Sequence, residues 1–506
     1  MSVHDFTVYS VIKRSAILYR DRTALICGDQ RITYQEYLTR VDRTADGLRA
    51  DGVKKGDRIA ILALNSAEFL YLYGAAAKIG AIVLPINWRL KPEEIAYILS
   101  DASPRVIFVD NEFQAMTAPL IATLDFIEKS YSMGQAQEGF AAFSELLDKK
   151  AKFAEIEVHS DDPYVILHTA AVEGKSRGAV MSHGSLLQAN LQVVTLWNIT
   201  PEDCSLGMLP IFHVTGLGFW LMLTHAGGTN IMLPRFDSDQ ALRCIQEHKV
   251  TMFAEFPPML TNMLDRNKEL QYDLSSLRHV GGMDGPDTVK RFEKESGATF
   301  WAAFGQSETS GMVTLAPYFE RPGSAGLPCL MSEVKLVDEY GNLVETGKTG
   351  EIVVRGPAVF KGYWNLEKET EHTFRDGWHH TGDMGRFDED GYLYYAGRMP
   401  EKELIKPGGE NVYPAEVEKA ILEHPLVEEV VVLGVPDEQW GEAIKAVCVL
   451  RKGESLQTSE LIEFVASRIA RFKKPKHVVF VSVLPKREDG SVHRGEVKAK
   501  YGESST

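Results

Sequence analysis

Three separated segments of the chain combine glycine with charged or polar side chains, which are residue types that bind phosphates and sugars. The first segment reads HTAAVEGKSRG and follows an apolar run. Gly174 and Gly178 would let the backbone approach a ligand closely, and Lys175 and Arg177 would supply positive charge for phosphate. The segment fails the P-loop pattern, because the position five residues before Gly174 is Thr169 rather than glycine. The alternative interpretation is an exposed basic turn.

The other two segments carry isolated carboxylates. One reads FGQSET and contains Glu308, although a lone glutamate in such a place is usually a solvated loop residue. Ser307 has glycine on one side only, so the segment does not indicate a nucleophile elbow. The last reads WHHTGD and ends at Asp383, which could accept hydrogen bonds from sugar hydroxyls, while Arg398 could donate others. Taken singly, each is more often a turn residue. Histidine spacing gives no HExxH pattern, so we expect no metal site built by protein side chains alone.

The composition is typical of a soluble globular protein with more than one domain. The chain has 506 residues, 44% hydrophobic and 25% charged, and a net charge of −15. This length predicts two or three domains, and the acidic balance argues against nucleic-acid binding. The five cysteines are scattered and odd in number, which indicates reduced thiols and a cytoplasmic location.

The sequence shows neither a signal peptide nor a membrane span. Charges are scattered through the N-terminal residues, and no apolar run approaches about 18 residues. The longest candidate, Val214–Leu223, is better explained as a segment of the core.

Strand-type and helix-type runs alternate in the first part of the chain. We expect strands at Arg58–Leu64, Ala81–Ile86 and Val106–Val109, separated by helices at Ala67–Ala77 and Pro92–Leu99. This order predicts parallel strands covered by helices. Ligands in such sheets bind beyond the carboxyl ends of the strands.

Short strands continue through the chain and then change character. Further strands are expected at Val165–Leu167, Met252–Ala254, His279–Val280 and Thr299–Ala302, each followed by glycine, proline or polar residues. From about Glu333, short strands with turn residues predict an antiparallel subdomain.

A separate C-terminal unit is predicted beyond a boundary near residues 397–402. Its expected elements are a helix at Pro414–Leu422, strands at Glu429–Leu433 and Ile444–Leu450, a helix at Glu460–Ala470 and a strand at Val478–Val483. These form a compact α/β unit of about 105 residues, enough for an independent core.

The weak segments gain meaning from their order along the chain. In chain order, the motifs are Leu209–Leu217 (LPIFHVTGL), Gly281-Gly282, Phe304–Glu308, Gly350–Pro357 (GEIVVRGP), Gly362–Trp364, Thr381–Asp383, Gly397-Arg398 and Lys406–Glu418 (KPGGENVYPAEVE). Over essentially its full length the chain resembles the adenylate-forming superfamily, which comprises acyl-CoA synthetases, luciferases and peptide-synthetase adenylation domains.

The resemblance implies an α/β fold with a large N-terminal domain of parallel, αβ-layered sheets and a small antiparallel subdomain. A small, mobile α/β lid follows. The large domain would comprise residues 1–398, the hinge residues 399–403 and the lid residues 404–506. Members of the superfamily first join a carboxylate to ATP, giving acyl-AMP and pyrophosphate. They then pass the acyl group to a thiol, usually that of CoA. The implied partners are therefore a small carboxylate and CoA, and a homodimer is left open.

The resemblance also implies a nucleotide site. Gly281, Gly282 and Phe304 would pack on adenine, Asp383 would bind ribose beside Arg398, and Glu308 would hold Mg²⁺. The full implied set is Thr169, Gly174, Lys175, Arg177, Gly178, Gly281, Gly282, Phe304, Gly305, Gln306, Ser307, Asp383 and Arg398.

Catalytic roles implied in the same way fall on Lys406, Glu308 and His213. Lys406 would face the adenylate during thioester formation, and His213 would border the acyl pocket. The residues implied for CoA, on the first strand of the lid, are Gly408, Gly409 and Glu410. The expected acyl pocket contains His213, Phe219, Trp220, Phe256, Met283 and Met312. These bulky apolar residues favour an aromatic, alicyclic or medium-length acid, although ordinary core packing explains them equally well.

Two departures from the superfamily pattern concern adenylation. The phosphate loop has Ala170, Ala171, Val172 and Glu173 where hydroxyl and glycine residues are typical. Ser491 stands where the superfamily places a catalytic lysine. Losing one preorganised transition-state group costs on the order of 3–4 kcal/mol.

Groups near the second departure could take over the missing charge. The candidates are Lys486, Arg487, His493 and Arg494. We therefore expect an acyl-CoA synthetase with impaired adenylation. The alternatives are an enzyme of the same fold that acts on acyl-adenylate or acyl-CoA without ATP, and a catalytically silent nucleotide- or acyl-CoA-binding protein.

Overall fold

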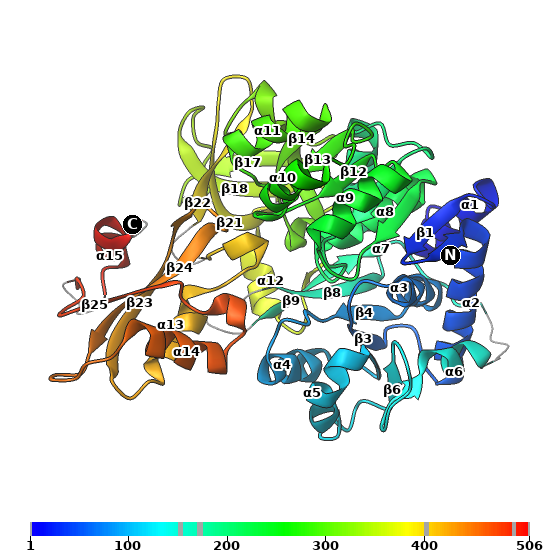
Figure 1. The fold of residues 1–506 in the computed structure, drawn as a ribbon, viewed down its shortest axis with the longest axis horizontal. Coiled ribbons are helices and arrows are strands. Elements are labelled where there is room, and N and C mark those ends of the chain that lie inside the picture. The colour runs from blue at the N-terminus through cyan, green and yellow to red at the C-terminus, as the bar shows by residue number, and fades with distance from the viewer. Residues whose placement is uncertain (1–2, 150–154, 170–175, 399–403, 488–491, 504–506) are drawn as a thin grey trace.

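Two large sheets form the framework of the N-terminal part of the chain (Figure 1). The computed structural model describes residues 3–149, 155–169, 176–398, 404–487 and 492–503. The first sheet has the order β19 (Gly362–Tyr363), β9 (Arg177–Ser182), β8 (Pro163–Thr169), β4 (Ile82–Pro85), β3 (Arg58–Leu62), β5 (Val106–Val109), β6 (Lys129–Ser132) and β7 (Ala141–Ala142). Its central strands are parallel and its β8–β9–β19 edge is antiparallel.

The second sheet carries the strands that end at the candidate site. Its order is β16 (Leu327–Pro328), β15 (Gly311–Pro317), β14 (Thr299–Gln306), β13 (His279–Gly281), β12 (Met252–Ala254), β10 (Cys204–Gly207), β11 (Thr229–Met232), β1 (Thr23–Cys27) and β2 (Gln30–Thr33). Strands β10 to β14 are parallel, as are β1 and β11. The expected parallel sheets are therefore confirmed.

Helices cover the sheets, and six of them contribute to one large core. These six are α1 (Val8–Leu18), α2 (Tyr34–Ala50), α3 (Ala67–Ile79), α6 (Phe143–Asp148), α7 (His183–Leu196) and α8 (Val214–Ala226). The other described helices of the large domain are α4 (Pro92–Ala102), α5 (Asn111–Ile121), α9 (Ser238–His248), α10 (Met259–Leu270), α11 (Pro286–Ser296) and α12 (Glu367–Thr373).

Helix α8 shows why the apolar run that begins at Val214 belongs to the core. Its residues from Gly216 to Thr224 are all buried, as expected for a helix that is apolar on every side. Gly227 ends the helix with a φ of 86°, in the left-handed region that favours glycine. No helix of the described residues is both long and apolar enough to span a membrane.

A buried asparagine connects the two large sheets and positions the loop before α8. Asn65, just beyond β3, donates from Nδ2 to the carbonyl oxygens of Leu209 and Leu233 at 3.0 and 3.1 Å. Its Oδ1 accepts a hydrogen bond from the Ile211 amide at 3.0 Å. The loop that contains Leu209 and His213 is therefore held from the neighbouring sheet.

The expected antiparallel subdomain is present after the second sheet. It contains β17 (Glu333–Val337), β18 (Thr349–Arg355), β20 (Phe374–Arg375), β21 (Trp378–Phe387) and β22 (Leu393–Arg398). Strand β21 pairs with β18, β20 and β22, always antiparallel.

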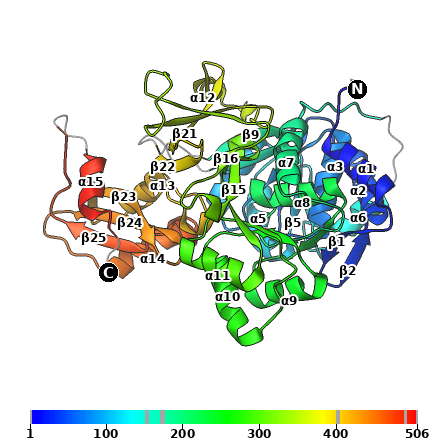
Figure 2. The same ribbon diagram turned by 90° about the horizontal axis from the view of Figure 1, so that it is seen from above.

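The C-terminal unit is a small domain with its own core. Strands β23 (Val427–Asp437), β24 (Gly441–Leu450) and β25 (His477–Val481) form its sheet, accompanied by α13 (Pro414–Leu422), α14 (Thr458–Arg468) and α15 (Arg494–Tyr501). Figures 1 and 2 both place α13 and α14 toward the large domain and α15 at the far end of the lid. The proposed hinge, residues 399–403, lies outside the described residues.

Candidate functional site

A cavity of about 440 Å³ lies where the ends of the second sheet meet the lid. Ala254 of β12, Gly281 of β13 and Gly305 of β14 line it, together with the loop and helix that follow β10. Lys406 and the residues after it line it from the lid. The carboxyl ends of parallel strands thus converge on one site, as expected for an open α/β sheet.

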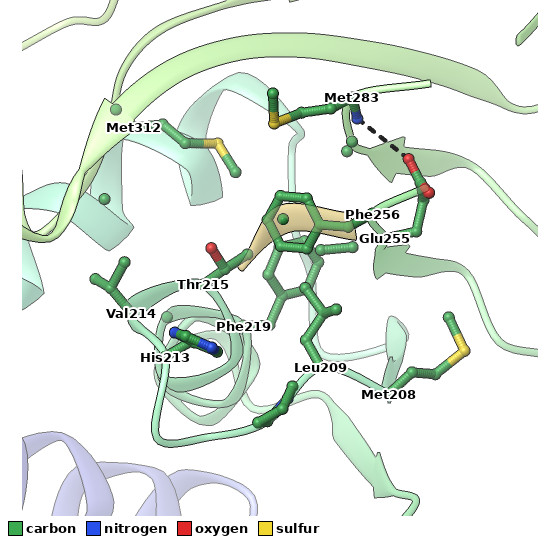
Figure 3. A pocket seen from close by; sticks show the side chains of 18 of the residues that line it. Met208, Leu209, His213, Val214, Thr215, Phe219, Glu255, Phe256, Met283 and Met312 are labelled. Atoms are coloured by element: carbon green, nitrogen blue, oxygen red, sulfur yellow. Dashed lines mark hydrogen bonds between the residues drawn. The ribbon is translucent and has the colours of Figure 1, made fainter. Parts of the chain in front are cut away.

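The wall of the cavity on the large-domain side is mostly apolar (Figure 3). Five of the six residues predicted for the acyl pocket line it: His213, Phe219, Phe256, Met283 and Met312. The prediction for Trp220 is wrong. Its side chain is buried in the core, where it stacks on Tyr73 with ring centroids 5.7 Å apart.

Gly282, directly after β13, makes room for a buried carboxyl group. A Cβ on Gly282 would lie 1.8 Å from Oε1 of Glu255, so any side chain at this position would displace that carboxyl group. The Met283 amide donates to the same oxygen at 3.2 Å (Figure 3). Burial is the main cause that raises the pKa of Glu255, and the neighbouring Asp284 raises it further. Glu255 therefore favours its neutral form in the cavity wall.

The end of β14 and the residue after it contribute Gly305, Gln306 and Ser307 to the cavity; all three were predicted to bind the nucleotide. Phe304 is not among the residues that line the cavity, and its packing on adenine stays a prediction. Alternate side chains of a strand point to opposite faces, and the Phe304 ring lies on the face away from Gly305, near Tyr395 at 6.3 Å between centroids.

Asp383 is buried at the centre of a polar cluster. Its Oδ1 lies 3.0 Å from Nε of Arg398 and accepts a hydrogen bond from the Tyr395 hydroxyl at 3.2 Å. Its Oδ2 accepts a hydrogen bond from Nε2 of Gln306, which also donates to the carbonyl of Thr381. Three of the residues predicted for the nucleotide therefore lie together, with both Asp383 oxygens already bonded to protein groups.

Glu308 lies in a short 3₁₀ turn directly after β14. The Tyr363 hydroxyl donates to Oε1 of Glu308 at 3.0 Å, and the Arg177 guanidinium lies 4.2 Å from the centre of the Tyr363 ring. Within the described residues no group of three or more metal-binding side chains occurs. A single carboxylate nonetheless fits Mg²⁺, which is commonly bound by one or two carboxylates together with substrate phosphates.

The predicted phosphate loop is only partly described. Gly174 and Lys175 lie outside the described residues, as do Ala170 to Glu173. Gly178 was expected to admit a ligand but lies within β9. A Cβ there would lie 2.6 Å from a methyl group of Ile166, so glycine is required by packing inside the sheet.

A second cavity of about 620 Å³ lies between α4 of the large domain and α13 and α14 of the lid. It begins at Thr169 and Ser176, on either side of the phosphate loop. His213, Ser307 and Glu410 line both cavities, so the two spaces meet at these residues.

The lid residues Gly408 and Gly409 form a 3₁₀ turn, so their predicted strand is wrong. Both have positive φ, 58° and 82°, which explains why the backbone turns here. A Cβ on Gly409 would also lie 2.7 Å from the Phe256 ring of the large domain. Glycine therefore serves both the turn and the close approach of the lid to the cavity.

Lys406, at the start of this turn, lies among charged groups from both domains. Burial is the main cause that lowers its pKa to about 8, and Arg398 lowers it further, whereas Asp383, Glu442 and Glu308 act to raise it. Its amide donates to Oε2 of Glu442 at 2.7 Å.

Glu410 binds the large domain rather than open space. The Arg89 guanidinium pairs with its carboxylate, Nδ2 of Asn87 donates at 3.3 Å, and Nε2 of His213 lies 3.4 Å from Oε1. Its predicted role in binding CoA is not visible in these contacts, which instead fasten the lid.

A second ion cluster crosses the same interface. Nζ of Lys473, a buried lid residue, donates to Oε1 of Glu416 at 2.6 Å and pairs with Glu94 of α4. Burial alone would lower the pKa of Lys473, but Glu416 and Glu94 raise it.

Sequence reasoning missed several residues of the site. These are Arg89, Asn190, Glu255, Asn411 and Lys473, of which the first four line the first cavity. None belongs to a motif with a recognisable spacing except Asn411, which follows the glycine pair in the quoted lid motif.

Comparison with known proteins places this arrangement in a family. The sequence model described as "AMP-binding enzyme" matches residues 12–364, and that of "AMP-binding enzyme C-terminal domain" matches residues 416–490. An indoleacetate–CoA ligase of Aromatoleum aromaticum is 34% identical over 495 residues, covering 96% of each chain.

Solved structures of CoA ligases and synthetases are also similar to this chain. A protein of Rhodopseudomonas palustris, assigned provisionally as a long-chain-fatty-acid CoA ligase, is 50% identical, with a TM-score of 0.76 over 78% of this chain and all of that one. A double mutant of o-succinylbenzoate CoA synthetase from Bacillus subtilis, bound with the product analogue OSB-NCoA, is 29% identical with a TM-score of 0.85 and 98% coverage of each chain.

We predict that Lys473→Met weakens closure of the lid, because Glu94 and Glu416 would face each other without the cation. Removing one partner of such a buried pair costs on the order of 3–5 kcal/mol. Faster hydrogen exchange in α4 and α13, and a larger radius of gyration by X-ray scattering, would report the loss. The matched control is Lys249→Met, which removes an exposed pair with Asp273 at 3.5 Å and should change neither measurement. Unchanged exchange in Lys473→Met would contradict the role of this cluster.

Proposed function

Because the chain belongs to the family of AMP-binding enzymes, we propose that it is an AMP-forming acyl-CoA ligase for a small to medium hydrophobic carboxylate. The observation that carries the proposal is the lid turn that contains Lys406, which closes an apolar cavity beside the Asp383 cluster. An acyl group, a nucleotide and a thiol must meet for this reaction, and the two joined cavities offer space for all three.

The proposed reaction has two steps. A carboxylate oxygen attacks the α-phosphorus of ATP, the bond to pyrophosphate breaks, and acyl-AMP forms. The sulfur of CoA, after losing its proton, then attacks the acyl carbon, and the bond to AMP breaks. Acyl-CoA and AMP are released.

The chain's own groups would act mainly by binding and by charge. Asp383 and Arg398 would hold the ribose, with Gly281 and Gly282 beside the base. The Lys406 ammonium would stabilise the negative charge that develops on AMP as it leaves. Glu308 would hold Mg²⁺, which when bound offsets the charge of the phosphates.

The size and lining of the first cavity support an aromatic, alicyclic or medium-length acid. Its volume of about 440 Å³ and its Phe and Met side chains suit a compact apolar body. The named relatives act on indoleacetate and on o-succinylbenzoate, which are both compact acids with a ring.

We further propose that adenylation is the slower half-reaction. Ser491 and the Ala170–Glu173 stretch lie outside the described residues, so this proposal depends on the sequence alone. Among the groups that could compensate, Lys486 pairs with Glu429 and Arg494 with Glu418, both inside the lid. Helix α15, which begins at Arg494, lies at the far end of the lid in both views (Figures 1 and 2).

The function is tested by incubating the protein with ATP, Mg²⁺, CoA and a panel of aromatic, alicyclic and fatty acids. We expect equal amounts of acyl-CoA, AMP and pyrophosphate with at least one compact acid. Supplied acyl-AMP replaces ATP in a second arm. Acyl transfer only in this second arm would favour the ATP-independent enzyme. Failure in both arms would favour a silent binding protein.

Ser491→Lys should restore charge where pyrophosphate leaves. We expect exchange of labelled pyrophosphate into ATP to rise about 10²-fold, the usual value of one transition-state group, while thioester formation from supplied acyl-AMP stays unchanged. Ser491→Gln is the uncharged control of similar length. A wild type that already exchanges rapidly, with no gain in the lysine variant, would refute impaired adenylation.

Thioester formation should depend on the charge of Lys406. Because its pKa is lowered to about 8, the ammonium predominates below pH 8 and is lost above it. We expect the rate from supplied acyl-AMP to fall as the pH rises through about 8. Lys406→Arg should remove this fall, since arginine stays charged. Lys406→Met should be slow at every pH. A wild-type profile that is flat from pH 7 to 9.5 would exclude the ammonium from this step.

A further inference from the structure

One polar side chain in the wall of the acyl cavity lacks the hydrogen bonds that burial demands. Asn190 lies on α7, in the stretch of that helix that faces the cavity with Ala189 and Val193. Only 5% of its surface is exposed. Its amide nitrogen Nδ2 is buried and makes no hydrogen bond with any of the described residues.

Such a group is costly in a folded protein. An amide removed from water without a compensating hydrogen bond destabilises the fold, and buried polar groups normally find partners for this reason. A leucine of nearly the same shape would fill the position without the penalty. An unsatisfied amide is therefore expected mainly at positions where it forms a hydrogen bond with a bound ligand.

The oxygen of the Asn190 amide faces Gly218 of α8, whereas Nδ2 itself is buried. On the facing helix α8 the opposing residue is Gly218, and a Cβ there would lie 3.0 Å from Oδ1 of Asn190. Because glycine has no side chain, no methyl group covers the amide, and Gly218 itself lines the cavity. Turning the amide by 180° exchanges oxygen and nitrogen, so the same position can offer an acceptor or a donor.

Other polar groups near Asn190 each make at least one hydrogen bond within the protein. Ser310 donates to the Ser185 hydroxyl at 3.0 Å, and Oε1 of Glu255 accepts from the Met283 amide. Gln192, two residues further along α7, accepts from the Met331 amide at 2.8 Å. Glu255 and Gln192 also leave one atom each, Oε2 and Nε2, without a partner, but both accept a hydrogen bond at Oε1. Asn190 differs because no hydrogen bond joins its side chain to any of the described residues.

We propose that Asn190 determines substrate specificity by hydrogen-bonding a hydroxyl group on the apolar body of the acyl substrate. The proposal rests on the proposed function and deepens it: the substrate class becomes hydroxylated aromatic or alicyclic acids. A hydroxyl both donates and accepts, so it satisfies the amide in either orientation. The remaining apolar wall, including Phe219 and Met312, encloses the ring that carries the hydroxyl.

The test compares acids that differ only by a hydroxyl or a methyl group of similar size. The pairs are the 4-hydroxyphenyl and 4-methylphenyl forms of benzoate, phenylacetate, phenylpropanoate and cinnamate, so that the hydroxyl is carried to several depths. For the best pair we expect wild-type kcat/KM for acyl-CoA formation to favour the hydroxyl acid at least tenfold, about the value of one hydrogen bond. Asn190→Leu should reduce this preference to about one or reverse it.

The matched control is Gln192→Leu, which removes a buried amide from the same helix but from a position not found among the cavity-lining residues. It should lower Tm and leave the hydroxyl-to-methyl ratio unchanged. Asn190→Leu, by contrast, should keep or raise Tm, because it removes an unsatisfied group. A fall in Tm as large as that of the control would show that Asn190 is structural and would overturn the proposal.

The wild type alone also decides the matter, even if Asn190→Leu does not fold. Acyl-CoA formed from the methyl acids as fast as from the hydroxyl acids would overturn the role of Asn190 while leaving the ligase function in place. Absence of acyl-CoA from every acid, with ATP or with supplied acyl-AMP, would instead refute the proposed function itself.

Discussion

The Glu410 carboxylate fixes the orientation of the lid on which the rest of the site depends. It is enclosed at the domain interface, where an unpaired charge would be costly, and its partners Arg89, Asn87 and His213 all belong to the large domain. Satisfying this one group brings the lid turn against the cavity. The position of Lys406 and the contact between Gly409 and Phe256 then follow from the geometry of a short turn.

Much of the architecture could be predicted because periodicity and motif order report local structure. The strand at Val106–Val109 and the helix at Pro414–Leu422 have the predicted bounds. Side-chain direction was harder. Helix α8 is apolar on all sides, so its sequence cannot tell that Phe219 faces the cavity and Trp220 the core. Alternation along β14 could have predicted that Phe304 faces away from the cavity. Neighbouring residues of a strand face opposite sides, and Gly305 lines the cavity.

Contacts between segments that are distant in the chain could not be predicted from the sequence. Lys473 and Glu94 are 379 residues apart, and only the packed domains bring their charges together. Asn190 was equally invisible, because an asparagine in a helix is most simply explained as an exposed residue. Its significance comes from the absence of a partner, which only the folded chain reveals.

The ion pairs that hold the lid also set how long it stays closed. At the Arg89–Glu410 pair the side chains remain 34% and 12% exposed, so dissolved salt can reach them. Ions screen such charges over a Debye length of about 8 Å at physiological ionic strength. If the lid must leave this orientation once in every turnover, the time that it stays closed depends on the salt concentration of the solution. More salt weakens the ion pairs and shortens that time. An interface sealed by apolar contacts alone would lack that sensitivity, because screening acts only on charges.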